Sequence, residues 1–130
     1  MKKVFLNHPL TIDGFRVIDD YEQIKTAIDN GETIMHYEFG DSMFPILMNG
    51  EYCKIIPTNK NDINVGDAVF CKMDYRKIGY GEVFMVHRCT DIVDSEGERF
   101  FKIESTSGTL YGWTTEVYAK CESTSYFERN

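Results

Sequence analysis

The chain has 130 residues, of which 42% are hydrophobic and 27% are charged, so it is long enough for one compact domain with a real core. Acidic residues outnumber basic ones by 21 to 14, which gives a net charge of -7. A domain whose main task is to grip phosphate backbones carries clustered lysine and arginine instead. The charge balance therefore argues against nucleic acid as the partner.

No apolar run approaches the length of a membrane span. The N-terminal stretch MKKVFLNHPL is a poor secretory signal, because Asn7, His8 and Pro9 interrupt its short apolar run. The sequence therefore predicts a cytoplasmic protein without a membrane anchor.

The cysteines are widely spaced and form no Cys-x-x-Cys pair, which leaves a metal site or a disulfide framework without support. Their strand-like surroundings favour buried free thiols. The four are Cys53, Cys71, Cys89 and Cys121. No metal and no other cofactor is predicted.

Residues 1–18 are predicted to form an N-terminal arm with one strand-like stretch, FRVI. The next stretch, DDYEQIKTAIDNG, predicts a helix over 19–30 that Asp19 or Asp20 can cap and that Gly31 ends. Its apolar residues recur at helical spacing: Tyr21, Ile24, Ala27 and Ile28.

From residue 32 to 122 the chain reads as one strand after another, with turn residues in every break. The runs are ETIMHYEF, EYCKIIP, DAVFCKM, EVFMVHRCTDIV, RFFKIES and VYAKCES. We predict a mostly β fold, a small β-sandwich or partly open barrel with one N-terminal helix packed on it. Residues 19–130 are expected to form a single domain.

A stretch rich in turn residues, EFGDSMFPIL, follows the first of these strands. Gly40, Asp41, Ser42 and Pro45 each favour a bent backbone, so Ser42 is expected where the chain leaves its sheet. A hydroxyl group there either makes ordinary turn hydrogen bonds or is a nucleophile held at the edge of a cleft.

Three stretches in this order, GDSMFPILMNGEYCKII, NVGDAVFCK and VFMVHRCTDI, resemble a serine peptidase superfamily. It unites signal peptidase I with the LexA-type and phage-repressor self-cleaving domains. The resemblance covers about residues 32–121 and implies the small, mostly β fold of that family. It also implies that Ser42 is the nucleophile. The base is usually a lysine before an arginine, and His87 takes that position before Arg88, as in the eukaryotic and archaeal-type signal peptidases.

The chemistry of peptide cleavage is compatible with a dyad of Ser42 and His87. A serine is a weak nucleophile until a base takes its proton, and histidine titrates near neutrality. Backbone N–H groups in the turn of Gly40, Asp41 and Ser42 are candidates to stabilise the oxyanion. As in signal peptidases, Met43 is expected to border the substrate groove.

The third catalytic group departs from the family pattern. The His-type signal peptidases have an aspartate after a glycine in a later segment, and FKIESTSGTLYGW contains no Gly-Asp. Glu104 is the nearest acidic candidate to orient His87, and Ser105 or Ser107 are further candidates. The self-cleaving relatives cut at Ala-Gly or Cys-Gly, and neither dipeptide occurs here.

Two functions stay open at this point. The first is a serine endopeptidase that cleaves an extended peptide, with a peptide or protein as its partner. The second is a catalytically inactive member of the same fold that serves as a binding, dimerisation or phage-assembly module. A second copy of the chain or a larger assembly would then be its partner.

Overall fold

The computed structural model describes residues 9–40 and 42–127 of the chain. Its elements are β1 (Thr11–Ile12), β2 (Phe15–Arg16), α1 (Tyr21–Asp29), β3 (Ile34–Tyr37), β4 (Glu51–Pro57), η1 (Lys60–Asp62), β5 (Ala68–Asp74), η2 (Arg76–Ile78), β6 (Glu82–Ser95), β7 (Glu98–Glu104), β8 (Leu110–Thr114) and β9 (Val117–Phe127). Seven strands form one antiparallel sheet in the order β3-β4-β9-β5-β6-β7-β8, which is not closed. The prediction of a mostly β chain with one helix is confirmed for the described residues.

Helix α1 is shorter than the predicted span of 19–30 because its cap residue is Asp20. The backbone of Asp20 is extended, and its side chain accepts hydrogen bonds from the N–H groups of Glu22 and Gln23. At the other end Asn30 caps the helix, and Gly31 follows with φ of +79°. Among the described residues this helix of nine is too short to span a membrane.

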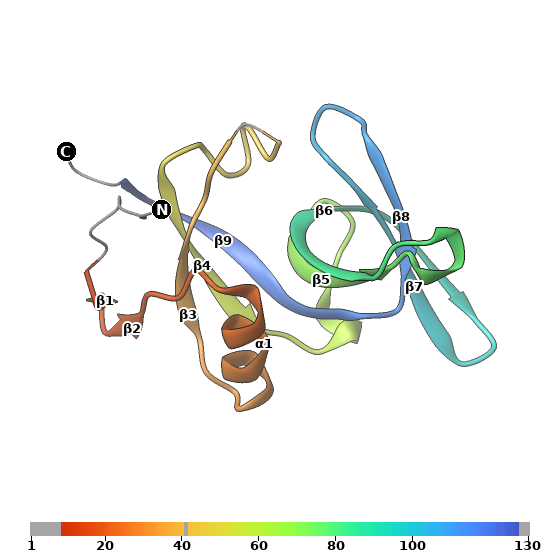
Figure 1. The fold of residues 1–130 in the computed structure, drawn as a ribbon, viewed down its shortest axis with the longest axis horizontal. Helices are drawn as coiled ribbons and strands as arrows, with labels where there is room; N and C mark the ends of the chain where they lie inside the picture. The colour runs from red at the N-terminus through yellow and green to blue at the C-terminus, as the bar shows by residue number, and fades with distance from the viewer. Residues whose placement is uncertain (1–8, 41, 128–130) are drawn as a thin grey trace.

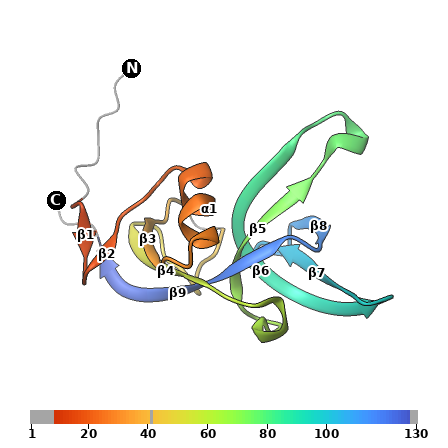
Figure 2. The same cartoon turned by 90° about the horizontal axis from the view of Figure 1, so that it is seen from below.

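Two long strands, β6 and β9, join the two halves of the sheet (Figures 1 and 2). Strand β9 pairs with β4 over its later residues and with β5 over its earlier ones, and β6 pairs with both β5 and β7. Strand β8 also returns to β5, where the Thr114 hydroxyl donates to the carbonyl oxygen of Lys72 at 2.7 Å. The second half of the sheet therefore curls back on itself.

Strand β5 is buried on both faces and separates two cores. Ala68 and Phe70 face the core under α1, whereas Val69, Cys71 and Met73 face the core inside the curled half. Because successive residues of a strand point to opposite faces, the buried residues of β5 alternate between the two cores, and their cross-strand partners on β6 share the same side. All four cysteines are buried and free, which confirms the prediction for them.

The described part of the N-terminal arm packs along the outer edge of β3. Val17 forms a parallel bridge with Met35, and the Ile18 N–H donates to the Met35 carbonyl oxygen at 2.9 Å. A third buried cluster lies between this arm and the sheet: Ile12, Met35, Tyr37 and Tyr52. At the other end of the chain β9 continues to Phe127, beyond the predicted end of the β core at 122.

Candidate functional site

The loop that carries Ser42 follows β3 and is closed at its base by β-type hydrogen bonds. The Gly50 N–H donates to the Glu38 carbonyl oxygen, and the Glu38 N–H donates to the Glu51 carbonyl oxygen, both at 2.8 Å. Within the loop, the Asn49 side chain accepts from the Gly40 N–H at 2.8 Å. These bonds make the loop a compact turn on the end of the β3–β4 pair.

Two residues of this loop anchor it in the core below. The side chains of Met43 and Leu47 are fully buried, and the Leu47 N–H donates to the Met43 carbonyl oxygen at 2.8 Å. Buried apolar surface contributes about 25 cal/mol per Å², so two such anchors stabilise the loop substantially. Because the Met43 side chain points inward, it does not line an open groove. Asp41, the remaining residue of the predicted oxyanion turn, lies outside the described residues.

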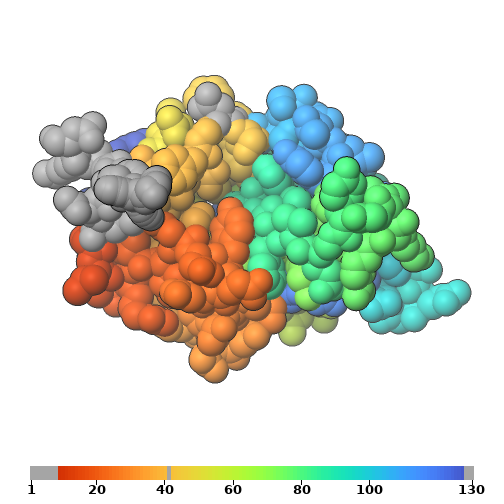
Figure 3. Space-filling model, in the orientation of Figure 1, coloured from red at the N-terminus to blue at the C-terminus, as the bar shows by residue number. Residues whose placement is uncertain are grey.

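Ser42 itself is fixed by a residue far away in the sequence. Its carbonyl oxygen accepts a hydrogen bond from the Thr106 N–H at 3.0 Å and another from the Thr106 hydroxyl at 2.9 Å. Thr106 lies in the loop between β7 and β8, and the surfaces of the two loops adjoin in Figure 3. Ser42 is thus held against the end of β7.

His87 lies on β6 and faces the core of the curled half together with Val69, its cross-strand partner. Its ring stacks on Tyr111, with the ring centroids 4.2 Å apart and the planes 20° apart. Burial lowers the pKa of His87 to about 4. The imidazole is therefore neutral at neutral pH, which is the form that can accept a proton.

The end of β7 lies next to both candidate residues. Arg88 and Glu104 are cross-strand partners on β6 and β7, so the chain after Glu104 continues alongside His87. Thr106, two residues further on, binds Ser42. The structure thus brings Ser42 and His87 to the same end of β7. No hydrogen bond joins their side chains within the described ranges, and the His87 Nδ1 atom is buried without a partner there.

Glu104 is not positioned to orient His87. As the cross-strand partner of Arg88, it shares the face of Arg88, and successive residues of a strand point to opposite faces. Its carboxylate pairs with Lys102 at 3.5 Å instead. The hydroxyl groups of Ser105 and Ser107 bond to each other at 2.9 Å. None of these three side chains has a hydrogen bond to His87 in the described part of the chain.

Comparison of the chain with protein-family models, with curated proteins and with solved structures found no match. The chemistry of Ser42 and His87 therefore has to follow from their own surroundings. Within residues 9–40 and 42–127, no three histidine, cysteine, aspartate or glutamate side chains gather as metal ligands. The groups at hand are one hydroxyl, one neutral imidazole and the backbone of an anchored turn.

Sequence reasoning missed Thr106, and it expected Met43 at the substrate groove, where the structure has Met43 buried. Phe44 and Met48 are exposed whereas Met43 and Leu47 are buried. The sequence did contain a pattern that could have separated them. Met43 and Leu47 are four residues apart, as are Phe44 and Met48, and residues four apart lie on the same side of a helical turn. The role of Thr106 had no such local signal, since it depends on the packing of two distant loops.

The double contact between Thr106 and Ser42 leads to a first prediction. Thr106→Val removes the hydroxyl donor and keeps the backbone donor, so we expect a loss of about 0.5–1.5 kcal/mol in the free energy of unfolding. We also expect faster amide hydrogen exchange over residues 42–50. Urea unfolding and mass-resolved exchange measure the two effects. The matched control is Thr109→Val, which changes an exposed threonine in the same loop. Equal exchange rates in the two variants would show that the Thr106 hydroxyl does not stabilise the Ser42 loop.

Proposed function

We propose that the chain is a serine endopeptidase-like domain that cleaves an extended peptide, with Ser42 as nucleophile and His87 as general base. The observation that carries the proposal is the fixed position of Ser42 at the end of β7, beside the strand that presents a neutral imidazole. The resemblance in sequence supports the same roles. The fold would then be the small sandwich or partly open barrel of the signal peptidase I and LexA-type superfamily, and its setting a bacterial or phage-infected cytoplasm.

In the proposed reaction, Ser42 Oγ attacks the carbonyl carbon of the scissile peptide bond while His87 takes the hydroxyl proton. The oxygen of that carbonyl becomes negatively charged, and backbone N–H groups of the turn around Ser42 would stabilise it. His87 then gives the proton to the leaving amine, and an acyl-enzyme ester remains. Water then attacks the ester while His87 takes a proton from it, and His87 returns that proton to Ser42 Oγ as the acid product leaves. The ring of His87 has to reach Ser42 when substrate binds, because catalytic hydrogen bonds often tighten only in the complex.

A second function is favoured by a specific observation. The His87 ring is stacked on Tyr111, and no side chain in the described residues orients its Nδ1 atom. A serine peptidase with a histidine base usually has such an orienting group. The alternative is a catalytically inactive member of the same fold that acts as a binding, dimerisation or phage-assembly module, with a second copy or another protein as its partner.

Reaction with a serine-directed acylating probe separates the two functions. For the peptidase we expect one adduct per chain by intact-mass spectrometry, no adduct in Ser42→Ala, and a rate at least about a hundredfold lower in His87→Ala. Because the pKa of His87 is about 4, the rate should hold down to mildly acidic pH and fall only as the pH drops through that value. Ser95→Ala is the control, since it removes an exposed serine at the far end of β6.

An adduct that still forms in Ser42→Ala would show that Ser42 is not the nucleophile. If no adduct forms with the wild-type protein from mildly acidic to alkaline pH, the inactive binding module becomes the better account. The next experiment would then be a search for its partner rather than for its substrate.

A further inference from the structure

The Tyr111 side chain covers one face of the His87 imidazole. The ring centroids are 4.2 Å apart and the planes meet at 20°, which is a stacked arrangement. The terminal torsion of a histidine side chain has broad energy minima, so a ring without partners can adopt many orientations. The His87 Nδ1 atom is buried and has no hydrogen-bond partner in the described ranges. The stack on Tyr111 is therefore the contact that restricts the plane of this ring.

Tyr111 lies at an irregularity in the pairing of β7 with β8. Ile103 of β7 pairs with Gly112 of β8. The next residue of β7, Glu104, pairs with Leu110, so Tyr111 is the extra residue of a β-bulge. A bulge interrupts the alternation of a strand and re-aims a side chain. It accounts for the direction of this side chain, which turns toward the ring on β6.

The backbone that carries Tyr111 is held in place from β5 and from the hairpin that follows it. The Tyr75 hydroxyl donates to the Tyr111 carbonyl oxygen at 2.8 Å. Gly112 has φ of +134°, and alanine at this position would place its Cβ 3.0 Å from the Met73 Cε atom. A residue without a side chain is thus required where β8 approaches β5. The Tyr111 ring is presented by a fixed backbone rather than by a loose loop end.

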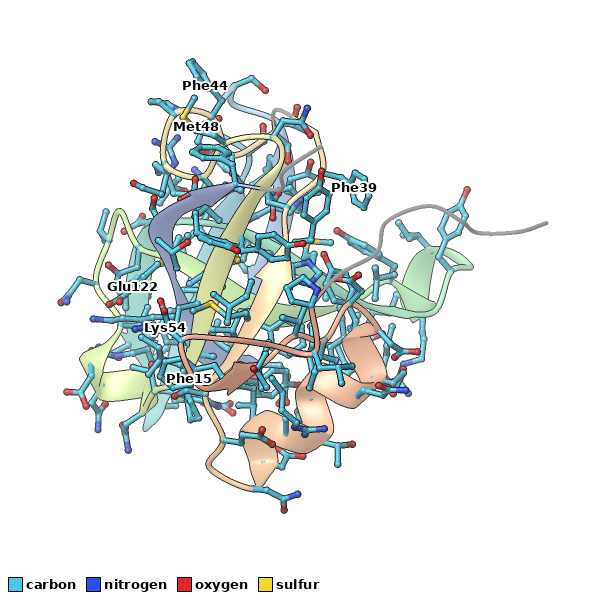
Figure 4. All side chains as sticks on the ribbon, turned by 90° about the vertical axis from the view of Figure 1, so that its left-hand side faces the viewer. Phe15, Phe39, Phe44, Met48, Lys54 and Glu122 are labelled. Carbon is cyan, nitrogen blue, oxygen red and sulfur yellow. The ribbon has the colours of Figure 1, made fainter. Side chains whose placement is uncertain are left out.

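Ser42 is fixed on its own side of the site. Met43 is buried in the core, whereas Phe44 and Met48 point outward at the outer end of the loop (Figure 4). Thr106 holds the Ser42 carbonyl oxygen from the end of β7. Because the loop is anchored in this way, the orientation of the imidazole decides whether the base can meet the hydroxyl group.

We infer that Tyr111 is a positioning residue for His87, whose imidazole it orients toward Ser42 by stacking, in place of a hydrogen-bonded third group. This inference rests on the proposed function. It assigns to an aromatic ring the task that none of the three polar candidates on β7 and in the following loop performs.

A stacked ring and a carboxylate have opposite effects on the charge of an imidazole. A carboxylate stabilises the imidazolium and raises its pKa, whereas an aromatic ring keeps water away and lowers it. Burial lowers the pKa of His87 to about 4. The thiol and phenol groups that share this core stay uncharged at that pH, because burial raises the pKa of each: Cys71, Tyr75 and Cys89. Removal of the Tyr111 ring should therefore change both the pKa of the base and its reactivity.

Two measurements test the role of Tyr111. An NMR titration of the histidine rings gives the pKa of His87, whose signal is the one missing from His87→Ala. The rate of reaction with a serine-directed acylating probe is followed over pH. In Tyr111→Ala we expect the pKa to rise by about one unit or more toward its ordinary value of about 6.5. The acidic fall in rate should move up with it, and the rate at higher pH should drop about tenfold or more.

Three further variants separate the ring from its bulk. Tyr111→Phe keeps the ring and should match the wild type in both measurements. Tyr111→Leu keeps apolar bulk without a planar face, so the pKa should stay low while the rate still falls, and it replaces Tyr111→Ala if that variant does not fold. Tyr118→Ala is the matched control, because this half-buried tyrosine contacts Phe70 in the other core, with ring centroids 5.9 Å apart. It should change neither quantity.

The inference would be overturned if the wild type forms its adduct and both Tyr111→Ala and Tyr111→Leu react at the same rate at every pH. The peptidase would then stand without it. Tyr111→Phe reacting as slowly as Tyr111→Ala would also overturn it, because the hydroxyl rather than the ring would matter. If the wild type forms no adduct, the peptidase is rejected and the titration decides. A His87 pKa that rises in Tyr111→Ala but not in Tyr111→Phe retains the stack, and an unchanged pKa rejects it.

Discussion

Replacing Glu51 with alanine is expected to lower the free energy of unfolding by about 2–4 kcal/mol and to loosen the loop that carries Ser42. The Glu51 carboxylate is almost completely buried, with the residue 1% exposed. It accepts hydrogen bonds from the Met48 N–H at 3.0 Å, from the Ser125 N–H at 2.9 Å and from the Ser123 hydroxyl. One side chain thus ties the end of the Ser42 loop to β9, and alanine leaves two backbone donors without their partner.

The pKa of Glu51 gives this prediction a dependence on pH. Burial alone would raise it, but the hydrogen bonds from Ser123, Met48 and Ser125 outweigh burial, and the pKa lies below its usual 4.5. A carboxyl group with a lowered folded pKa stabilises the protein above its unfolded pKa, and this contribution disappears as the pH falls through the folded value. The difference between wild type and Glu51→Ala should therefore be largest at neutral pH and should shrink in acid.

Urea unfolding at neutral and acidic pH measures the effect, and hydrogen exchange over 42–50 reports the loop. Glu51→Gln keeps one acceptor oxygen and should lose less stability than Glu51→Ala. Glu122→Ala, on the exposed side of β9, is the control and should change the free energy of unfolding by less than about 0.5 kcal/mol. The role assigned to Glu51 would be wrong if Glu51→Ala unfolds at the same urea concentration as Glu122→Ala.

The elements that could be predicted from sequence are those with local causes. Helix α1 follows from apolar residues at helical spacing and from an aspartate that can cap it, although only the structure decides that Asp20 rather than Asp19 is the cap. The β strands follow from β-branched and aromatic runs between turn residues. The order of the strands does not follow, because β9 lies between β4 and β5 and its place depends on contacts across the whole chain.

The same distinction holds for the candidate site. Ser42 stands out because its neighbours are turn residues, and the pair of His87 and Arg88 stands out because of the resemblance. The hydrogen bonds from Thr106 to Ser42 join residues 64 positions apart, so no local sequence pattern predicts them. Glu104 was a candidate because it is near in sequence to the expected third group. Its register on β7 places it on the face of Arg88, and a single residue of shift would have reversed that face.

Glu38 and Glu51 were also beyond sequence reasoning, since acidic residues at strand ends usually face solvent. Here both are buried at the base of the Ser42 loop, where Ser123 and Ser125 of β9 donate hydrogen bonds to the Glu51 carboxylate. Glu38 is 6% exposed, and its pKa is raised to about 7 by burial and by the charge of Glu51. Below about pH 7 the two carboxyl groups thus differ in charge, because hydrogen bonds stabilise the ionised form of Glu51 whereas Glu38 stays mostly protonated.

Glu38→Gln is therefore expected to stabilise the protein above pH 7 and to have little effect near pH 4. A carboxyl group whose folded pKa is raised favours the folded state only while it is protonated. Its contribution is fully present below the unfolded value of 4.5 and is lost as the pH rises through about 7. Glutamine stays neutral throughout, so at pH 8 it should raise the free energy of unfolding by about 1–3 kcal/mol over wild type.

Urea unfolding of both proteins from pH 4 to pH 8 tests this, with Glu98→Gln at the exposed start of β7 as the control. A difference that is the same at every pH would show that the amide packs better or worse, and that Glu38 does not titrate near neutrality. If the difference in the free energy of unfolding between Glu38→Gln and wild type grows from pH 4 to pH 8, ionised Glu38 destabilises the folded protein through its burial and its repulsion by Glu51. Since Glu38 also closes that base by accepting from the Gly50 N–H, its ionisation would loosen the segment that positions Ser42. Hydrogen exchange over 42–50 should then quicken with pH beyond its intrinsic rate in wild type and not in Glu38→Gln.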